Sequence, residues 1–303
     1  MCAQTNSALG NWLANYQFFC VGSLPFLSAR KAVQFIFENS KILPFWPELP
    51  RINEQELSLK RAERALGPEW AGYMESEASG LFETLRHLNG RPRLELIKAQ
   101  LLGPLTLAHF SDSLNGELAQ KLPQALEATL KQIDWQWERL RQVAERVLFV
   151  LDEPGLAQWD HLSSAEQDML SHAFKYLHEK ITKRGDFLGV HSCAGFLPLL
   201  LELPFDLVSF DATQEDPVAE IIQPRLQSWR NALQRGVILA PGVWKAVQGQ
   251  PYAEARQAGL VRFEALKRAL GGLTAEGDQP LMLPSANCGH AFAEAAWVDG
   301  IYA

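Results

Sequence analysis

The sequence predicts a single (β/α)8 barrel, the TIM-barrel architecture, as one domain over residues 1–303. Short apolar segments typical of buried strands alternate with longer segments of helical spacing, and from about residue 94 the alternation is regular. Such alternation implies a parallel sheet with helices outside it. Eight units over about 300 residues fit a barrel better than an open sheet, for which we would expect a glycine-rich phosphate loop that this sequence lacks.

The composition is that of an ordinary globular protein, with 47% hydrophobic residues, 21% charged residues and a net charge of −7. An acidic chain of this kind has no basic surface for nucleic acid. No apolar run approaches the roughly 20 residues that a membrane span needs. The first residues lack a basic region followed by an apolar one, so we expect no secretory signal and a cytoplasmic location. Four cysteines at this density indicate metal binding or catalysis rather than a disulfide framework.

The first third of the chain predicts two strands and their helices. Residues 1–16 are expected to form an irregular N-terminal arm, followed by a buried strand over 17–22. Ser28 can cap a helix that runs to about Asn39. The segment 42–50 holds three prolines, which remove ladder donors and allow only an irregular strand.

The rest of the chain supplies the regular alternation. Helical spacing covers residues 53–90 and 114–146, and Ser163 with Glu166 forms a capping box that opens a helix to about Lys183. The remaining segments share the same pattern of short strand and longer helix. The expected strands are 94–102, 146–151, 187–190, 206–210, 236–240 and 281–283, and the expected helices are 196–203, 217–234, 252–271 and a short final one.

Polar residues at strand ends suggest a metal site. His191 and Cys193 follow the strand 187–190, Asp211 follows the next strand, and Cys288 follows the last. Because the carboxyl ends of barrel strands meet at one mouth, two thiolates and an imidazole there would make a strong zinc set. Other interpretations remain open: Cys288 could be a small buried loop residue, Asp211 could cap a turn, and Asp152 with Glu153 could terminate a strand.

In order along the chain, the motifs resemble the C-terminal catalytic barrel of cobalamin-independent methionine synthase, within the wider group that includes uroporphyrinogen decarboxylase. The matching segments extend over almost the whole chain. They are Val21-Gly22-Ser23-Leu24-Pro25, Lys98 to Thr106, Leu151-Asp152-Glu153-Pro154, Val190-His191-Ser192-Cys193, Val208-Ser209-Phe210-Asp211, Ala240-Pro241-Gly242-Val243 and Asn287-Cys288-Gly289.

The resemblance implies a zinc-dependent methyltransferase that converts homocysteine to methionine. It implies zinc ligands at His191, Cys193, Asp211 and Cys288, with the metal keeping the substrate thiol as the nucleophilic thiolate. It also implies that residues near the mouth bind the amino-acid part of the substrate. These are Ser23 and Asp152, with Glu48 or Glu75 as a further contact to the amino group.

The chain departs from the family pattern in three places. Asp211 stands where the family has the longer Glu, and no His follows Val243 in the segment Trp244-Lys245-Ala246-Val247. The chain also has no room for the second barrel that helps to bind the folate donor in the full-length synthase. We therefore expect the methyl donor to be either a methylfolate or a methylcorrinoid, the latter carried by a partner corrinoid protein.

Two alternatives come from the same considerations. A porphyrinogen decarboxylase would need no metal, and arginines near the first strand would bind its substrate's propionates. The turn after that strand holds no arginine before Arg30. The other alternative is a non-catalytic accessory protein that stores zinc or delivers a corrinoid, which would bind metal without any turnover of a thiol.

Overall fold

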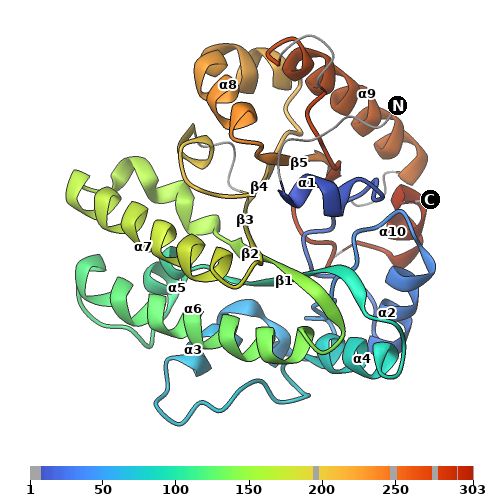
Figure 1. Ribbon diagram of the computed structural model, residues 1–303. Helices are drawn as coiled ribbons and strands as arrows, with labels where there is room; N and C mark the ends of the chain where they lie inside the picture. The colour runs from blue at the N-terminus through green and yellow to red at the C-terminus, as the bar shows by residue number, and fades with distance from the viewer. Residues whose placement is uncertain (1–7, 194–197, 246–250, 275–278, 292, 303) are drawn as a thin grey trace.

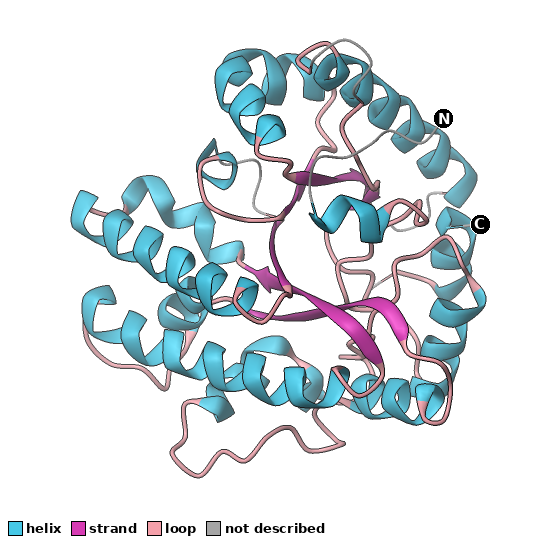
Figure 2. Ribbon diagram, in the orientation of Figure 1, coloured by secondary structure: helices cyan, strands magenta, loops and turns pink. Residues whose placement is uncertain are grey.

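The protein is an α/β fold built on a curled sheet of six parallel strands in the order β1 to β6, with helices around its outside (Figures 1 and 2). The computed structural model describes residues 8–193, 198–245, 251–274, 279–291 and 293–302. The strands are β1 (Leu94–Leu102), β2 (Ala144–Asp152), β3 (Phe187–Ser192), β4 (Leu207–Asp211), β5 (Ile238–Trp244) and β6 (Ser285–Ala286). All adjacent pairs are parallel, as the alternation of strands and helices predicts.

Two N-terminal segments continue the curl without forming named strands. Isolated parallel bridges join Phe18 to Ile42, Ser23 to Glu48, and Phe45 to Lys98 in β1. On the other side, Phe19 N donates to Pro284 O at 3.2 Å, just before β6. The fold is therefore TIM-like, with six strands in continuous ladders that make a half-barrel. In the described residues no continuous ladder closes the other half, where the prolines of 42–50 cannot donate.

Ten α-helices are present in the described part of the chain. They are α1 (Ala8–Leu13), α2 (Ala29–Glu38), α3 (Ser58–Ala65), α4 (Ser79–Leu88), α5 (Pro104–Phe110), α6 (Leu118–Leu140), α7 (Ser164–Thr182), α8 (Leu226–Gln234), α9 (Tyr252–Gly271) and α10 (Ala295–Tyr302). The helix start predicted at Ser28 is confirmed by its side chain, which accepts from Lys31 N at 3.4 Å. The capping box of Ser163 and Glu166 is also confirmed.

The N-terminal arm is more ordered than the sequence suggests. Residues Ala8–Leu13 form helix α1, and Leu9 and Leu13 are fully buried. They belong to a cluster that includes the first residues of three strands, Phe187 of β3, Leu207 of β4 and Ile238 of β5. The helix therefore covers the N-terminal end of the barrel with two leucines. The prediction of an irregular segment was wrong for residues 8–13, because Leu9 and Leu13 are four residues apart and a helix places both on the face that is buried.

Several predicted helices are shorter or more broken in the structure. The span 53–90 holds α3 and α4 with a loop between them, and the span 114–146 is trimmed to α6. The span 217–234 begins as a π-helix (Val218–Ile222) and a 3-10 turn (Gln223–Arg225) before α8, since Pro224 interrupts the helical hydrogen bonds. Of the helix expected over 196–203, Pro198–Leu201 is a 3-10 turn, and residues 196–197 lie outside the described residues.

The last predicted strand, over 281–283, is also reduced. Met282 makes an isolated bridge to Leu239, and the ladder continues as β6 two residues after Leu283. A further 3-10 helix, Pro154–His161, follows β2, and a short one, Glu54–Glu56, precedes α3. No helix in the described residues is long and apolar enough to cross a membrane.

Candidate metal centre

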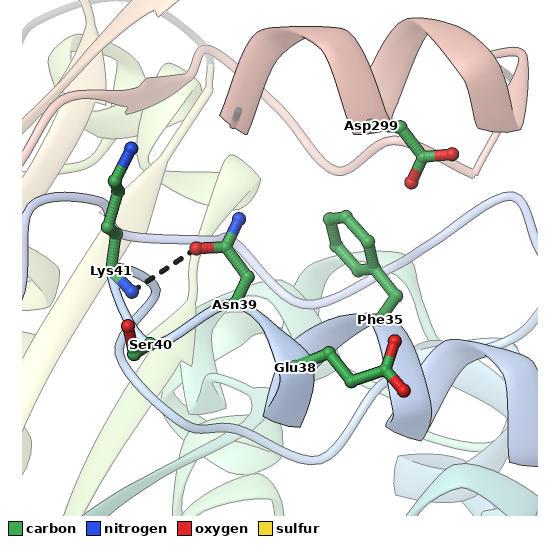
Figure 3. A pocket seen from close by; sticks show the side chains of 6 residues that line it. All are labelled: Phe35, Glu38, Asn39, Ser40, Lys41 and Asp299. Atoms are coloured by element: carbon green, nitrogen blue, oxygen red, sulfur yellow. Dashed lines mark hydrogen bonds between the residues drawn. The ribbon is translucent and has the colours of Figure 1, made fainter.

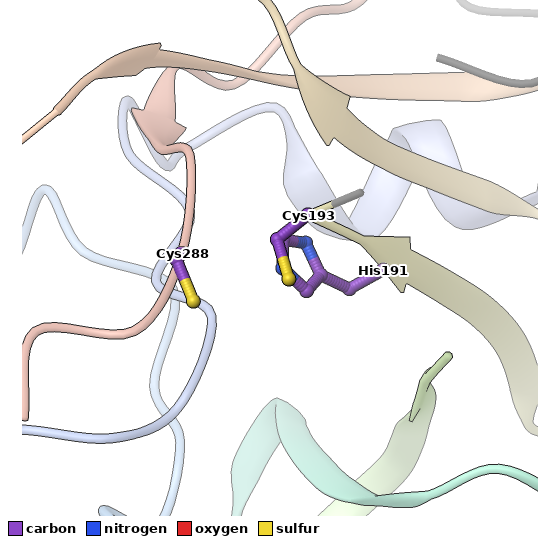
Figure 4. A group of neighbouring side chains, drawn as sticks. All are labelled: His191, Cys193 and Cys288. Atoms are coloured by element: carbon purple, nitrogen blue, oxygen red, sulfur yellow. The ribbon is translucent and has the colours of Figure 1, made fainter. Parts of the chain in front are cut away.

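His191, Cys193 and Cys288 meet at the C-terminal edge of the strands (Figure 4). His191 lies at the end of β3, Cys193 follows directly, and Cys288 sits on the separate segment after β6. One ligand atom from each side chain lies within 4.8 Å of the other two. His191 is buried, Cys193 is half-buried and Cys288 is exposed, so the group opens towards solvent on one side.

The imidazole of His191 is oriented for a ligand. Its Nδ1 lies 2.9 Å from the hydroxyl of Ser209, which is its register partner on β4. If Nδ1–H donates to this hydroxyl, the lone pair of Nε2 points away from the strand. Nε2 is buried and has no hydrogen-bond partner. A buried polar atom without a partner is costly, so this orphan nitrogen fits a position that a metal ion completes.

The pKa values of the two thiols are shifted in opposite directions by their contact. The pKa of Cys288 is lowered to about 4, chiefly by its contact with the Cys193 thiol and further by the neighbouring His191. The pKa of Cys193 is raised, because its proton is held by Cys288 and because the side chain is partly desolvated. One thiolate therefore stands ready, and the second can form when a cation replaces the proton on Cys193.

Asp152 lies beside this group. It ends β2 and is the register partner of His191. Burial raises the pKa of its carboxyl, and the charge of His191 opposes that rise. Its Oδ1 is buried and has no hydrogen-bond partner. A carboxylate oxygen held dry and unpaired at the strand ends can accept a donor group from a bound small molecule.

A buried lysine stands behind Asp152 and was not assigned a role from the sequence. The Lys98 ammonium donates to Val21 O at 2.6 Å and to Gln100 Oε1 at 2.8 Å. It also lies 5.3 Å and 5.2 Å from the ring centres of Phe19 and Phe45. Burial lowers the pKa of Lys98 to about 7, and the neighbouring Cys20 and Asp152 act in the opposite direction.

Ser23 is brought to the segment that carries Cys288. Its carbonyl accepts from His290 N at 2.8 Å. Its hydroxyl lies so close to Gly289 that a Cβ on that residue would stand 1.8 Å from Ser23 Oγ. Glycine is therefore needed at position 289 for this approach, and the Asn287-Cys288-Gly289 motif has a packing reason as well as a chemical one.

The two glutamates predicted to bind substrate lie in different settings. Glu48 pairs with Ser23 through the backbone, and its carboxylate forms an ion pair with the buried Arg61. Glu75 is 60% exposed and forms a 2.8 Å ion pair with Arg86 of α4. The structure thus places Glu48 next to Ser23 at a strand end, whereas Glu75 lies on the loop before α4 with its carboxylate in solvent.

Asp211 does not belong to the group of His191, Cys193 and Cys288, whose ligand atoms lie within 4.8 Å of one another. Its Oδ1 accepts from Thr213 N at 2.8 Å and from Thr213 Oγ1 at 2.7 Å. Its Oδ2 accepts from Asn287 Nδ2 at 3.2 Å. Both oxygens are therefore occupied, and Asp211 caps a turn while it holds the residue that precedes Cys288. This is the alternative that the sequence left open for it.

Part of the motif pattern is structural. Glu153 is fully buried and accepts from Leu105 N at 3.0 Å and from Thr106 N at 2.8 Å at the start of α5. A Cβ at Gly103 would stand 2.1 Å from Glu153 Oε1. The Gly103-to-Thr106 and Asp152-Glu153-Pro154 motifs are therefore in contact. Glu153 holds the start of α5 in place and has a structural role rather than a ligand-binding one.

A surface pocket of about 470 Å³ lies away from this group, between the end of α2 and helix α10 (Figure 3). It is lined by Phe35, Glu38, Asn39, Ser40, Lys41 and Asp299. None of these was predicted to bind metal or substrate. The side chain of Asn39 accepts from Lys41 N at 3.2 Å within it.

Comparisons with known proteins gave one kind of match. No protein-family model and no curated protein sequence matches this chain. Among solved structures, the chain is similar to a B12-independent methionine synthase from a Shewanella species in complex with selenomethionine. The similarity covers 95% of both chains at 14% sequence identity, with a TM-score of 0.49.

Proposed function

We propose that this protein is a zinc-dependent thiol methyltransferase that converts homocysteine to methionine, with a methylcorrinoid or a methylfolate as the methyl donor. The observation that carries the proposal is the group of His191, Cys193 and Cys288, whose ligand atoms lie within 4.8 Å of one another. Two thiols and one imidazole at an edge that opens to solvent suit a zinc ion with a fourth position left for an exchangeable ligand.

A zinc ion bound by these three side chains would lower the pKa of a substrate thiol and hold the sulfur as a thiolate. The residues of the chain prepare that position. Ser209 fixes the imidazole of His191, so that Nε2 faces the site. The contact between the two thiols lowers the pKa of Cys288, which favours a thiolate at one of the three ligand positions.

Residues around the group suit an amino-acid thiol. Asp152 offers a buried, unpaired carboxylate oxygen beside His191 for an ammonium group. Ser23 and Glu48 line the neighbouring strand ends. In the transfer, the sulfur forms a new bond to the methyl carbon while the bond from methyl to donor breaks, and its electron pair stays with the donor. A donor bound to a partner corrinoid protein would approach from the exposed side, next to Cys288.

The proposal is tested by the metal content of the protein, measured by elemental analysis after preparation without added metal. We expect about one zinc per chain in the wild type and loss of that zinc in Cys193→Ser and Cys288→Ser. Cys20→Ser is the matched control, since Cys20 is a buried thiol of the described residues that is not part of this group, and this variant should keep its zinc. Wild-type protein without metal, even after re-addition of zinc, would refute the metal centre.

A second step separates an enzyme from an accessory protein. Zinc-loaded protein is incubated with homocysteine and with methylcobalamin or methylfolate in turn, and methionine is measured. Formation of methionine that depends on Cys193 supports a methyltransferase. Stoichiometric zinc without methionine from either donor, free or on a corrinoid protein, would instead favour the non-catalytic role. The thiols need a reducing compartment such as the cytoplasm in either case.

A further inference from the structure

The segment that carries Cys288 is held by side chains and single backbone bonds rather than by a ladder. It follows β6, which has only two residues. Asn287 N donates to Trp244 O at 2.8 Å on one side, and His290 N donates to Ser23 O at 2.8 Å on the other. The position of the Cys288 sulfur relative to His191 and Cys193 therefore depends on what fixes His290 and its neighbours.

Tyr302, in the last helix of the chain, reaches this segment from behind. Its hydroxyl lies 2.9 Å from His290 Nε2 and is also in hydrogen-bond contact with the backbone of Ala286 and the side chain of Cys20. The hydroxyl thus contacts one residue on each side of Cys288, Ala286 and His290, and it also contacts Cys20 in the segment 17–22. Tyr302 and His290 are 0% and 3% exposed, so these contacts are not shared with solvent.

The tyrosine is itself firmly placed. Its ring packs edge-on against Phe18 and Trp244, at centre distances of 5.5 Å and 5.9 Å. Its carbonyl accepts from Asn39 Nδ2 at 3.1 Å, beside the pocket between α2 and α10. Because packing fixes the ring of Tyr302, its hydroxyl can hold the groups to which it hydrogen-bonds in a defined position.

We propose that Tyr302 is a positioning residue for the metal centre, which holds Cys288 at ligating distance through His290 and Ala286. The inference rests on the proposed zinc site and adds a role for the C-terminal helix. Groups that orient metal ligands typically change metal affinity by roughly 10–100-fold when they are removed. Loss of the hydroxyl alone should therefore weaken zinc binding without removing any ligand.

The test compares Tyr302→Phe with Tyr73→Phe. Tyr73 is a buried tyrosine whose hydroxyl donates to Gln132 Oε1 at 2.8 Å and accepts from Gln136 Nε2 at 3.4 Å, so its loss removes two buried hydrogen bonds outside this segment. Zinc affinity is measured by competition with a chelator, and the unfolding midpoint of the metal-free proteins is measured in parallel. We expect a roughly 10–100-fold loss of zinc affinity in Tyr302→Phe and none in Tyr73→Phe, with similar losses of stability in both.

Cobalt substitution supplies a second readout, since the visible absorption of Co²⁺ reports the geometry of thiolate ligation. The band should change in Tyr302→Phe and stay unchanged in Tyr73→Phe. His290→Leu keeps the backbone bond to Ser23 and should give the same loss as Tyr302→Phe, and the double variant should be no worse than either single one. If Tyr302→Phe does not fold, His290→Leu carries the test alone.

The outcomes separate this inference from the proposed function. A wild type that binds no zinc overturns both. A wild type that binds zinc, together with a Tyr302→Phe variant of unchanged affinity and unchanged cobalt spectrum, overturns the role of Tyr302 and leaves the metal centre standing. An equal loss of zinc affinity in Tyr73→Phe would show a general effect of stability and would also overturn the inference.

Discussion

The two halves of the barrel are built differently. Strands β1 to β5 pair through continuous parallel ladders of four to eight register partners each, and they supply Asp152, His191 and Ser209. The other half, made by residues 17–50 and 279–291, is joined by isolated bridges, by single backbone hydrogen bonds and by the two-residue strand β6, which pairs irregularly with β5. Ser23 and Cys288 come from this second half. The candidate metal group therefore spans the two halves, with His191 and Cys193 on the regular half and Cys288 on the irregular half.

This difference predicts what metal removal does to the protein. Zinc at 100 times its dissociation constant would stabilise the folded state by about 2.7 kcal/mol, because it binds only the folded chain. This stabilisation should act mainly on the segment that carries Cys288, because the metal would link that segment to a half-barrel that is already held by ladders. Amide hydrogen exchange is expected to speed up at 285–302 when zinc is removed, and to change little in β1 and β2.

A uniform change of exchange over both halves would contradict this view. Faster exchange confined to β3 would also contradict it, because the metal would then stabilise the strand that carries His191 rather than the segment that carries Cys288. The control is the Cys193→Ser protein, in which addition and removal of zinc should leave exchange at 285–302 unchanged.

The same contrast explains how far the sequence could predict the fold. The regular half obeys local rules, and β1 and α9 begin and end where apolar runs and helical spacing place them. In the irregular half, prolines and single bridges replace the ladder. Its strand 42–50 could be recognised as irregular, but its partners could not, because the bridges of Phe18 and Phe45 depend on how the chain closes.

The site was predictable to the same degree. His191, Cys193 and Cys288 could be found because thiols and imidazoles at strand ends are rare and specific. Ser209, Lys98 and Tyr302 were missed because their roles depend on partners distant in sequence. A polar residue inside an apolar strand was the only signal for the first two. Asp211 was ambiguous for a physical reason, since a carboxylate that caps a turn and one that binds metal look alike in sequence.

Lys98 lies where the two halves of the barrel meet. It belongs to β1, while its backbone N–H donates to Pro44 O at 2.8 Å and its ammonium donates to Val21 O. Its pKa is lowered to about 7, so between about pH 7 and 10.5 the folded state binds fewer protons than the unfolded state. The free energy of unfolding should therefore rise with pH through this window, by up to roughly 5 kcal/mol if Lys98 acts alone.

In Lys98→Met the contribution of Lys98 should be missing, so the unfolding free energy should rise much less steeply from pH 7 to 10 than in the wild type. The measurement is urea unfolding at several pH values in that range. Lys60→Met is the matched control, because Lys60 is exposed and pairs only with Glu63 at the surface, and it should keep the wild-type profile. A rise of the same steepness in Lys98→Met and in the wild type would show that the Lys98 ammonium stays charged in the folded wild-type protein.

The smallest expected effect concerns Asp211, which ends β4 and contacts Asn287 of the irregular half. In Asp211→Asn the oxygen that faces Thr213 can be kept, but the new amide would face the amide of Asn287, where Asp211 now accepts. If Asp211 only holds Asn287, zinc affinity should fall by a few-fold, which corresponds to about 1 kcal/mol for one hydrogen bond. Chelator competition measures this change directly, and Asp216→Asn, on an exposed turn, is the control.

A loss of zinc affinity as large as that of Cys288→Ser would make Asp211 a ligand after all. Its carboxylate would then have to leave Thr213 and Asn287 when the metal binds.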